Sequence, residues 1–114
     1  MRKRILLLLV AICGSAPAAA YEIGTYRCQT YNVSGGDGSC RLAEPIELNA
    51  DGSYRESKTK GVYRVNGDRI TFSESRFRGP GQFVAENKFV FRYNYKDKDY
   101  IVTYLCRNDC HPKR

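Results

Sequence analysis

Apolar and polar residues alternate with a period of two along most of the chain after residue 20, and turn residues interrupt the alternation about every ten positions. Successive side chains of a β-strand point to opposite faces, so this alternation predicts strands that bury one face. We predict eight short strands, near residues 25–31, 45–48, 53–57, 61–65, 69–74, 82–85, 88–95 and 100–107. The sequence therefore predicts an all-β fold, a small antiparallel meander.

Four turns predict how neighbouring strands pair. They lie around Gly52, at Lys58-Thr59, at Asn66-Gly67 and at Asp97-Lys98. Each predicted register sets large apolar side chains opposite one another, so the inward faces of successive strands agree. The predicted partners are Leu48 with Tyr54, Tyr54 with Tyr63, Tyr63 with Ile70 and Phe89 with Cys106, and on the outer face Glu47 with Arg55 and Arg64 with Arg69.

A meander of this size has two ways to remove its exposed edges. It can close into a small barrel, similar in outline to a lipocalin, or form a two-layer sandwich, and both stay open at this point. The predicted interior is mainly aromatic and consists of Tyr54, Tyr63, Phe72, Phe89, Phe91, Tyr93 and Tyr104. These side chains leave little room inside a barrel, so we expect any binding to use loops or the outer face.

Residues 1–20 have the organisation of a secretory signal peptide. The basic segment 2–4 precedes an apolar run, 5–12, that is too short to cross a bilayer, and alanines at 18–20 form a small-residue cleavage site. We therefore predict an exported protein, in the periplasm or outside the cell. Its mature part would be one domain, 21–114, with no transmembrane segment.

The charge of the mature part is modest. The chain carries 19 Lys and Arg against 12 Asp and Glu, and three of the basic residues lie in segment 2–4, which leaves a net charge of +4. This excess suits weak attraction to anionic envelope glycans or lipid headgroups and does not by itself predict nucleic-acid binding. Lipidation of Cys13 is an alternative fate of the leader, but Ile12 stands where lipoprotein leaders place a small residue.

Four cysteines follow the leader, and an even number in an exported domain predicts disulfide bonds. In a closed barrel the first and last strands are neighbours, with Cys28 and Cys106 on their inward faces. We therefore favour a Cys28–Cys106 bond, which leaves Cys40 to pair with Cys110. The pairing of Cys28 with Cys40 and of Cys106 with Cys110 stays open.

Few residues suit catalysis. General acid–base catalysis most often uses a positioned histidine, and the only histidine, His111, lies in the last four residues. Two carboxylate pairs, Glu44 with Glu47 and Asp97 with Asp99, leave a small secreted hydrolase as an alternative, although Asp97 and Asp99 lie in a predicted turn, where aspartate is favoured for conformational reasons. We predict a protein that is not an enzyme.

A zinc site could be assembled from Cys106, Cys110 and His111, because zinc accepts thiolate and imidazole ligands. Oxidised cysteines are the more frequent state in exported proteins, and the spacing lacks the Cys-x2-Cys pair of a zinc ribbon. We therefore predict neither a metal nor a cofactor.

A basic row is predicted on the outer face. Arg64 and Arg69 fall opposite each other in the predicted register, and Lys58 and Lys60 lie at the adjacent turn. Like charges directly opposite each other destabilise a strand pair, so a bound anion is one explanation for this arrangement. The other explanation is an ordinary solvated face with the side chains splayed apart.

A second candidate surface lies between two predicted strands. Arg76, Phe77 and Arg78 precede the turn-forming sequence Gly79-Pro80-Gly81. Aromatic and arginine residues are enriched in binding hot spots, which makes this segment a candidate partner-binding loop. The alternative is that Phe77 folds back and caps the open end of the barrel.

These features together predict a non-enzymatic exported module that binds a protein partner, such as a hydrolase inhibitor or an envelope accessory factor. The main alternative is a cationic module for anionic envelope polymers, and the second is the small secreted hydrolase. The identity of the partner does not follow from the sequence.

Overall fold

The computed structural model describes residues 20–74 and 78–113, so the predicted signal peptide up to residue 19, including Cys13, lies outside the described residues. All eight predicted strands are present, and two additional short strands, β2 and β10, accompany them. The elements in chain order are β1 (Glu22–Val33), β2 (Gly36–Asp37), the short 3-10 helix η1 (Cys40–Leu42), β3 (Ile46–Leu48), β4 (Ser53–Glu56), β5 (Thr59–Asn66), β6 (Arg69–Phe72), β7 (Gly81–Ala85), β8 (Lys88–Tyr95), β9 (Lys98–Cys106) and β10 (His111–Pro112).

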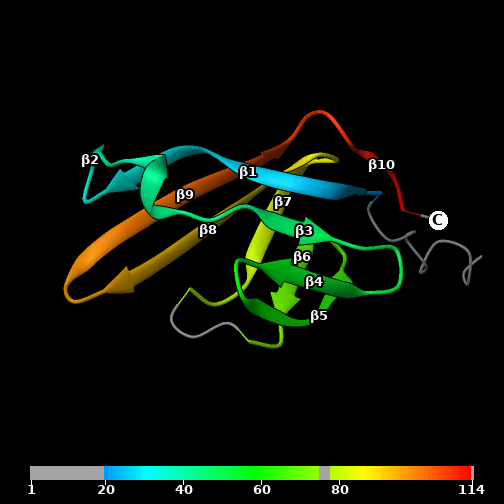
Figure 1. The fold of residues 1–114 in the computed structure, drawn as a ribbon. Helices are drawn as coiled ribbons and strands as arrows, with labels where there is room; N and C mark the ends of the chain where they lie inside the picture. Colours follow the sequence, from blue (N-terminus) through cyan, green and yellow to red (C-terminus); the bar gives the residue numbers. More distant parts are fainter. Residues whose placement is uncertain (1–19, 75–77, 114) are drawn as a thin grey trace, which may run out of the picture.

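Eight antiparallel strands close into a barrel (Figure 1). From β3 to β9 each strand pairs with the next along the chain, and β1 closes the ring by pairing with both β3 and β9. Tyr26 of β1 lies opposite Ile46 of β3 on one side and opposite Cys106 of β9 on the other. The all-β prediction is confirmed, and of its two forms the barrel is the one that the chain adopts.

The barrel interior is filled mainly by aromatic rings. Phe89 stacks on Tyr104 with ring centroids 5.6 Å apart, and the ring centroid of Tyr26 lies 4.7 Å from that of Phe89. Of the seven side chains predicted to lie inside, six are buried and Tyr93 is half-buried. Burial of such rings is the main favourable contribution to the stability of a domain this small.

The alternation predicted the inward faces correctly, but three of the four hairpin registers are shifted by two residues. The register around Gly52 is confirmed, with Leu48 opposite Tyr54 and Glu47 opposite Arg55. In the other three hairpins Tyr54 lies opposite Gly61 rather than Tyr63, Tyr63 opposite Phe72 rather than Ile70, and Phe89 opposite Tyr104 rather than Cys106. A shift of two residues keeps every side chain on its face, so the hydrophobic pattern does not detect it.

The shifts arise from the position of each two-residue loop. The loops lie at 57–58, 67–68 and 96–97, each one position from the predicted turn. Their first residues have a positive φ, 55° at Ser57, 66° at Gly67 and 52° at Lys96, as the tight turns of β-hairpins require. Glycine marks only one of these positions, and it occupies the first place in the loop instead of the predicted second place.

The two disulfide bonds join Cys28 to Cys40 and Cys106 to Cys110. The favoured prediction, Cys28 with Cys106 and Cys40 with Cys110, is therefore wrong, and the pairing that had been left open is correct. β1 and β9 are neighbours as predicted, but Tyr26, two residues before Cys28, is the residue opposite Cys106. The chain after β2 instead returns along β1 and brings the Cα atom of Cys40 to 5.5 Å from that of Cys28.

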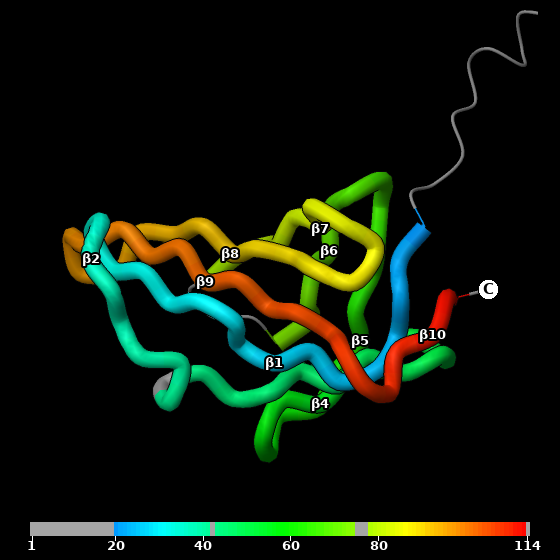
Figure 2. Tube along the Cα trace, turned by 90° about the horizontal axis from the view of Figure 1, so that it is seen from above, coloured from blue at the N-terminus to red at the C-terminus, as the bar shows by residue number. Residues whose placement is uncertain are grey.

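Three neighbouring strands of the ring, which we call the long strands, extend beyond β3, β4 and β6; β5, with eight residues, is as long as one of them. β1, β8 and β9 have 12, 8 and 9 residues, whereas β3, β4 and β6 have 3, 4 and 4. The long strands run on side by side beyond the short ones toward β2, at the end of the barrel that we call the mouth (Figures 1 and 2). At the other end β10 pairs with the beginning of β1. In the described part of the chain, no helix is long and apolar enough to span a membrane.

Candidate functional site

A cleft of about 380 Å³ opens at the mouth of the barrel. We call it the mouth cleft and define it by six of the residues that line it. They are Tyr31, Glu44, Glu56, Arg78, Tyr93 and Tyr104. These residues come from β1, β4, β8 and β9 and from the segments that precede β3 and β7, so the cleft exists only in the closed barrel.

Arg78 lies inside the mouth cleft rather than pointing away from the barrel. Its guanidinium forms an ion pair with Glu56, with 2.6 Å between Nη2 and Oε1, and lies 4.5 Å from the ring centre of Phe91. Only 15% of the Arg78 side chain and 21% of the Glu56 side chain are exposed. Water screens such a pair less than an exposed one, so Arg78 is held in a fixed position.

The predicted partner-binding loop is therefore only partly visible. Arg78, its third residue, faces the mouth cleft. Arg76 and Phe77 lie outside the described residues. Both sequence-based readings, a recognition loop and a cap formed by Phe77, stay predictions.

Three tyrosines form a ledge on the long strands at the edge of the cleft, which two of them, Tyr31 and Tyr93, also line. Tyr93 of β8 and Tyr100 of β9 stack in parallel with centroids 4.9 Å apart, and Tyr31 of β1 meets Tyr100 edge to face at 6.1 Å. We call Tyr31, Tyr93 and Tyr100 the tyrosine ledge. All three are half-buried, so one side of the cluster packs on the core and the other is open to solvent.

Two phenol groups of the mouth are adapted to burial. Tyr104 donates a hydrogen bond of 3.0 Å to the backbone oxygen of Glu44, and its burial raises the pKa of its hydroxyl. Burial also raises the pKa of Tyr93, and the neighbouring Tyr31 adds to this effect. Both hydroxyls therefore stay protonated at neutral pH, where they act as hydrogen-bonding groups and not as bases.

The predicted basic row takes a different form. Lys58, Lys60, Arg64 and Arg69 are all exposed. However, Arg64 lies opposite Thr71, and Arg69 lies opposite Asn66, so the predicted Arg64–Arg69 pair is wrong. The two-residue shift of this hairpin is the cause, and it removes the argument that a bound anion must compensate those two charges. An anion-binding face at these four residues stays a prediction.

Two like charges do lie opposite each other in the preceding hairpin, where Arg55 of β4 pairs with Lys60 of β5. There the chain supplies its own compensation, because Glu47 lies on the other side of Arg55 and forms an ion pair with it at 3.2 Å. Both side chains of this pair are largely exposed, so it contributes little to stability.

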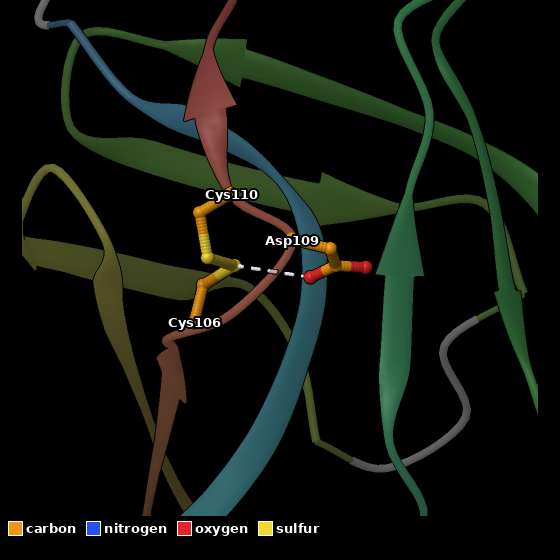
Figure 3. Close-up of side chains that lie close together, drawn as sticks. All are labelled: Cys106, Asp109 and Cys110. Carbon is orange, nitrogen blue, oxygen red and sulfur yellow. Dashed lines mark hydrogen bonds between the residues drawn. A yellow bond between two sulfur atoms is a disulfide. The ribbon is translucent and has the colours of Figure 1, made fainter.

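Two of the residues considered for zinc, Cys106 and Cys110, form a structural clamp together with Asp109, whereas His111 belongs to β10. Cys106, Asp109 and Cys110 lie together (Figure 3), with one potential ligand atom of each within 4.8 Å of the others, but both sulfur atoms are in a disulfide and are not thiolate ligands. The Asp109 carboxylate accepts hydrogen bonds of 2.9 and 2.7 Å from the amide and hydroxyl of Thr25, and these bonds lower its pKa. This network fixes the chain after β9 to β1.

The candidate catalytic residues are not gathered at one place. His111 is exposed in β10, opposite Ile23 of β1. Glu44 lines the mouth cleft, whereas Glu47 is paired with Arg55 on the outer face. Asp97 lies in the β8–β9 turn with a φ of 65°, where its role is conformational.

Comparison with known proteins gave no matching family model, no similar curated protein and no similar solved structure. The geometry of the chain therefore carries the functional argument alone.

Proposed function

We propose that this protein is an exported, non-enzymatic module that binds a protein partner at the mouth of its barrel. The observation that supports the proposal is the combination of the tyrosine ledge with the fixed arginine of the mouth cleft. Tyrosine and arginine dominate the binding energy of many protein interfaces, and the cleft of about 380 Å³ has room for a side chain projecting from a partner.

The rigidity of the site strengthens the proposal. Binding is weakened when side chains lose conformational freedom on association, typically by about 0.5–1.5 kcal/mol for each mobile side chain that becomes fixed. Tyr93 and Tyr100 are already stacked, and Arg78 is already held by Glu56 and Phe91. A partner would therefore meet a surface that is largely organised before binding.

Export is part of the proposal. The two disulfide bonds are compatible with an oxidising compartment, and the leader-like sequence of residues 1–20 points to the periplasm or the outside of the cell. Within this location we propose a role as an inhibitor of a secreted hydrolase or as an accessory factor of the envelope.

The proposal is tested by affinity capture followed by a variant series. The secreted, oxidised protein is immobilised, proteins of its own envelope and culture fluid are passed over it, and a retained protein is purified for titration. Tyr31→Ala and Tyr93→Ala should each weaken that partner at least tenfold, as expected of hot-spot residues.

The matched control is Ile101→Ala. Ile101 belongs to β9 like Tyr100, but it is 42% exposed on the outer face of the barrel, and this variant should bind as the parent does. Thermal unfolding of each variant separates loss of binding from loss of fold. If the tyrosine variants keep the parent affinity while remaining folded, the mouth is not the binding surface.

A further inference from the structure

A second depression, of about 370 Å³, lies on the outer wall of the barrel across β6, β7 and β8. We call it the outer groove. Its principal lining residues are Asp68, Arg69, Pro80, Gln82, Val90 and Arg92. None of them lines the mouth cleft, so the outer groove is a separate surface.

The strand register explains how the groove is built. Arg69 of β6, Gln82 of β7 and Val90 of β8 are successive partners, so they form one row on the outside of the barrel. Val90 is only 7% exposed, although its neighbours Phe89 and Phe91 fill the interior on the opposite face. The groove therefore has an apolar floor at Val90 and Pro80.

Two arginines stand on either side of this floor. Neighbouring strands lie about 4.8 Å apart, so β6 and β8 are separated by about 10 Å across β7, and their arginine side chains can both reach a group placed between them. Arg69 and Arg92 are exposed, and neither forms an ion pair with another residue in the described part of the chain. Both guanidinium groups are thus available to a ligand.

One acidic residue limits the charge of that ligand. Asp68 lies at the rim, where its Oδ2 atom accepts a 3.2 Å hydrogen bond from Nε2 of Gln82. With Asp68, Arg69 and Arg92 as its charged residues, the groove has a net charge of +1. This balance matches a single carboxylate better than a doubly charged phosphate, which Asp68 would repel about twice as strongly.

We propose that the outer groove binds a carboxylate-bearing sugar unit of an acidic polysaccharide. Arginine recognises carboxylates through paired, directional hydrogen bonds, and two arginines here face the same space. The floor of Val90 and Pro80 suits the apolar face of a sugar ring, and the Asp68–Gln82 pair at the rim offers acceptors and donors to its hydroxyl groups. This activity is independent of the protein binding proposed for the mouth.

The test uses a tetramer of galacturonic acid as the probe and isothermal titration or amide NMR shifts as the readout, with the oxidised full chain. Arg69→Gln and Arg92→Gln should each weaken binding at least tenfold. Arg64→Gln removes the same charge from the outer face of β5, outside the groove, and should change the affinity less than twofold. All three arginines are exposed, and thermal unfolding checks that the variants remain folded.

Three probes define what would overturn the proposal. A neutral tetramer of glucose should not bind, and inorganic phosphate should bind more weakly than the acidic tetramer. If tetraglutamate binds as tightly as the sugar, or if Arg64→Gln weakens binding as much as Arg69→Gln, the groove acts only as general positive charge. Absence of binding by the acidic tetramer at low salt would also refute the proposal.

Discussion

The ion pair between Glu56 and Arg78 allows a quantitative test of how the mouth is organised. We consider Glu56→Gln, Arg78→Met and the double variant. Methionine keeps an apolar, polarisable side chain against the ring of Phe91 while removing the charge, and glutamine keeps the shape of glutamate. The three variants form a double-mutant cycle that isolates the interaction between the two side chains.

The expected magnitude follows from the burial of the pair. Exposed ion pairs contribute roughly 0.2–1 kcal/mol, whereas removal of one partner of a fully buried pair costs roughly 3–5 kcal/mol. With 15% and 21% of the side chains exposed, this pair lies between these limits, and we expect each single variant to lose about 2 kcal/mol of unfolding free energy. In a domain of this size that loss lowers Tm by roughly 10 °C.

The assay is urea unfolding of the four proteins at constant pH, with thermal unfolding as a second measurement. The double variant should lose about 1 kcal/mol less unfolding free energy than the two single variants lose together, because neither unpaired charge then remains at the mouth. The Glu47–Arg55 pair is the matched control, since its side chains are 40% and 57% exposed, and its coupling should be smaller. Equal coupling in the two cycles would refute the argument from burial.

Two further predictions concern the covalent and hydrogen-bonded clamps. Replacement of both cysteines of one bond by serine should destabilise the protein by about 3 kcal/mol for Cys28–Cys40 and by about 2 kcal/mol for Cys106–Cys110. The reason is that the bond closing the longer loop restricts the unfolded chain more, so its removal gives the unfolded state more entropy. A reversed order in urea unfolding would contradict this. Asp109 has a lowered pKa through its bonds to Thr25, so its stabilising effect is complete above its ordinary pKa of 3.8 and decreases as the pH falls further. Asp109→Asn should therefore be less stable than the parent at pH 6, and the difference should shrink as the pH falls below 3.8; a pH-independent difference would argue against this reasoning.

The sequence is sufficient to predict the faces of the strands but not their registers. Alternation identified the inward position of Tyr54, Tyr63 and Phe89, because a residue on the wrong face would expose a ring to water. A slip by two residues exposes nothing, and only the turn then decides between registers. The turn at Gly52 predicted the correct register, because a glycine marks the position of positive φ. The loops that begin at Ser57 and Lys96 place residues other than glycine at positive φ, so the sequence does not mark where these turns begin.

The disulfide pairing and the candidate sites depend on these registers, which is why the sequence left the correct pairing as an alternative and did not predict the mouth cleft or the outer groove. The Cys28–Cys106 prediction needed the two cysteines to be opposite, and a displacement of two residues along β1 was enough to exclude it. The outer groove was missed for a similar reason. Arg69 was identified, but Arg92 is 23 residues away in the chain. The two arginines line one groove only because β6 and β8 both pair with β7.

The mouth follows from unequal strand lengths, which connects the fold to the proposed function. In a ring of equal strands, every inward side chain is covered by the opposite wall. Here β1, β8 and β9 continue beyond the short β3, β4 and β6, so the inward residues at the mouth ends of these strands leave the interior (Figure 1). The same alternation that buries Phe89 and Phe91 therefore brings Tyr93, on the same face, to a half-buried position. Tyrosine suits that position because its ring packs on the core while its hydroxyl forms hydrogen bonds.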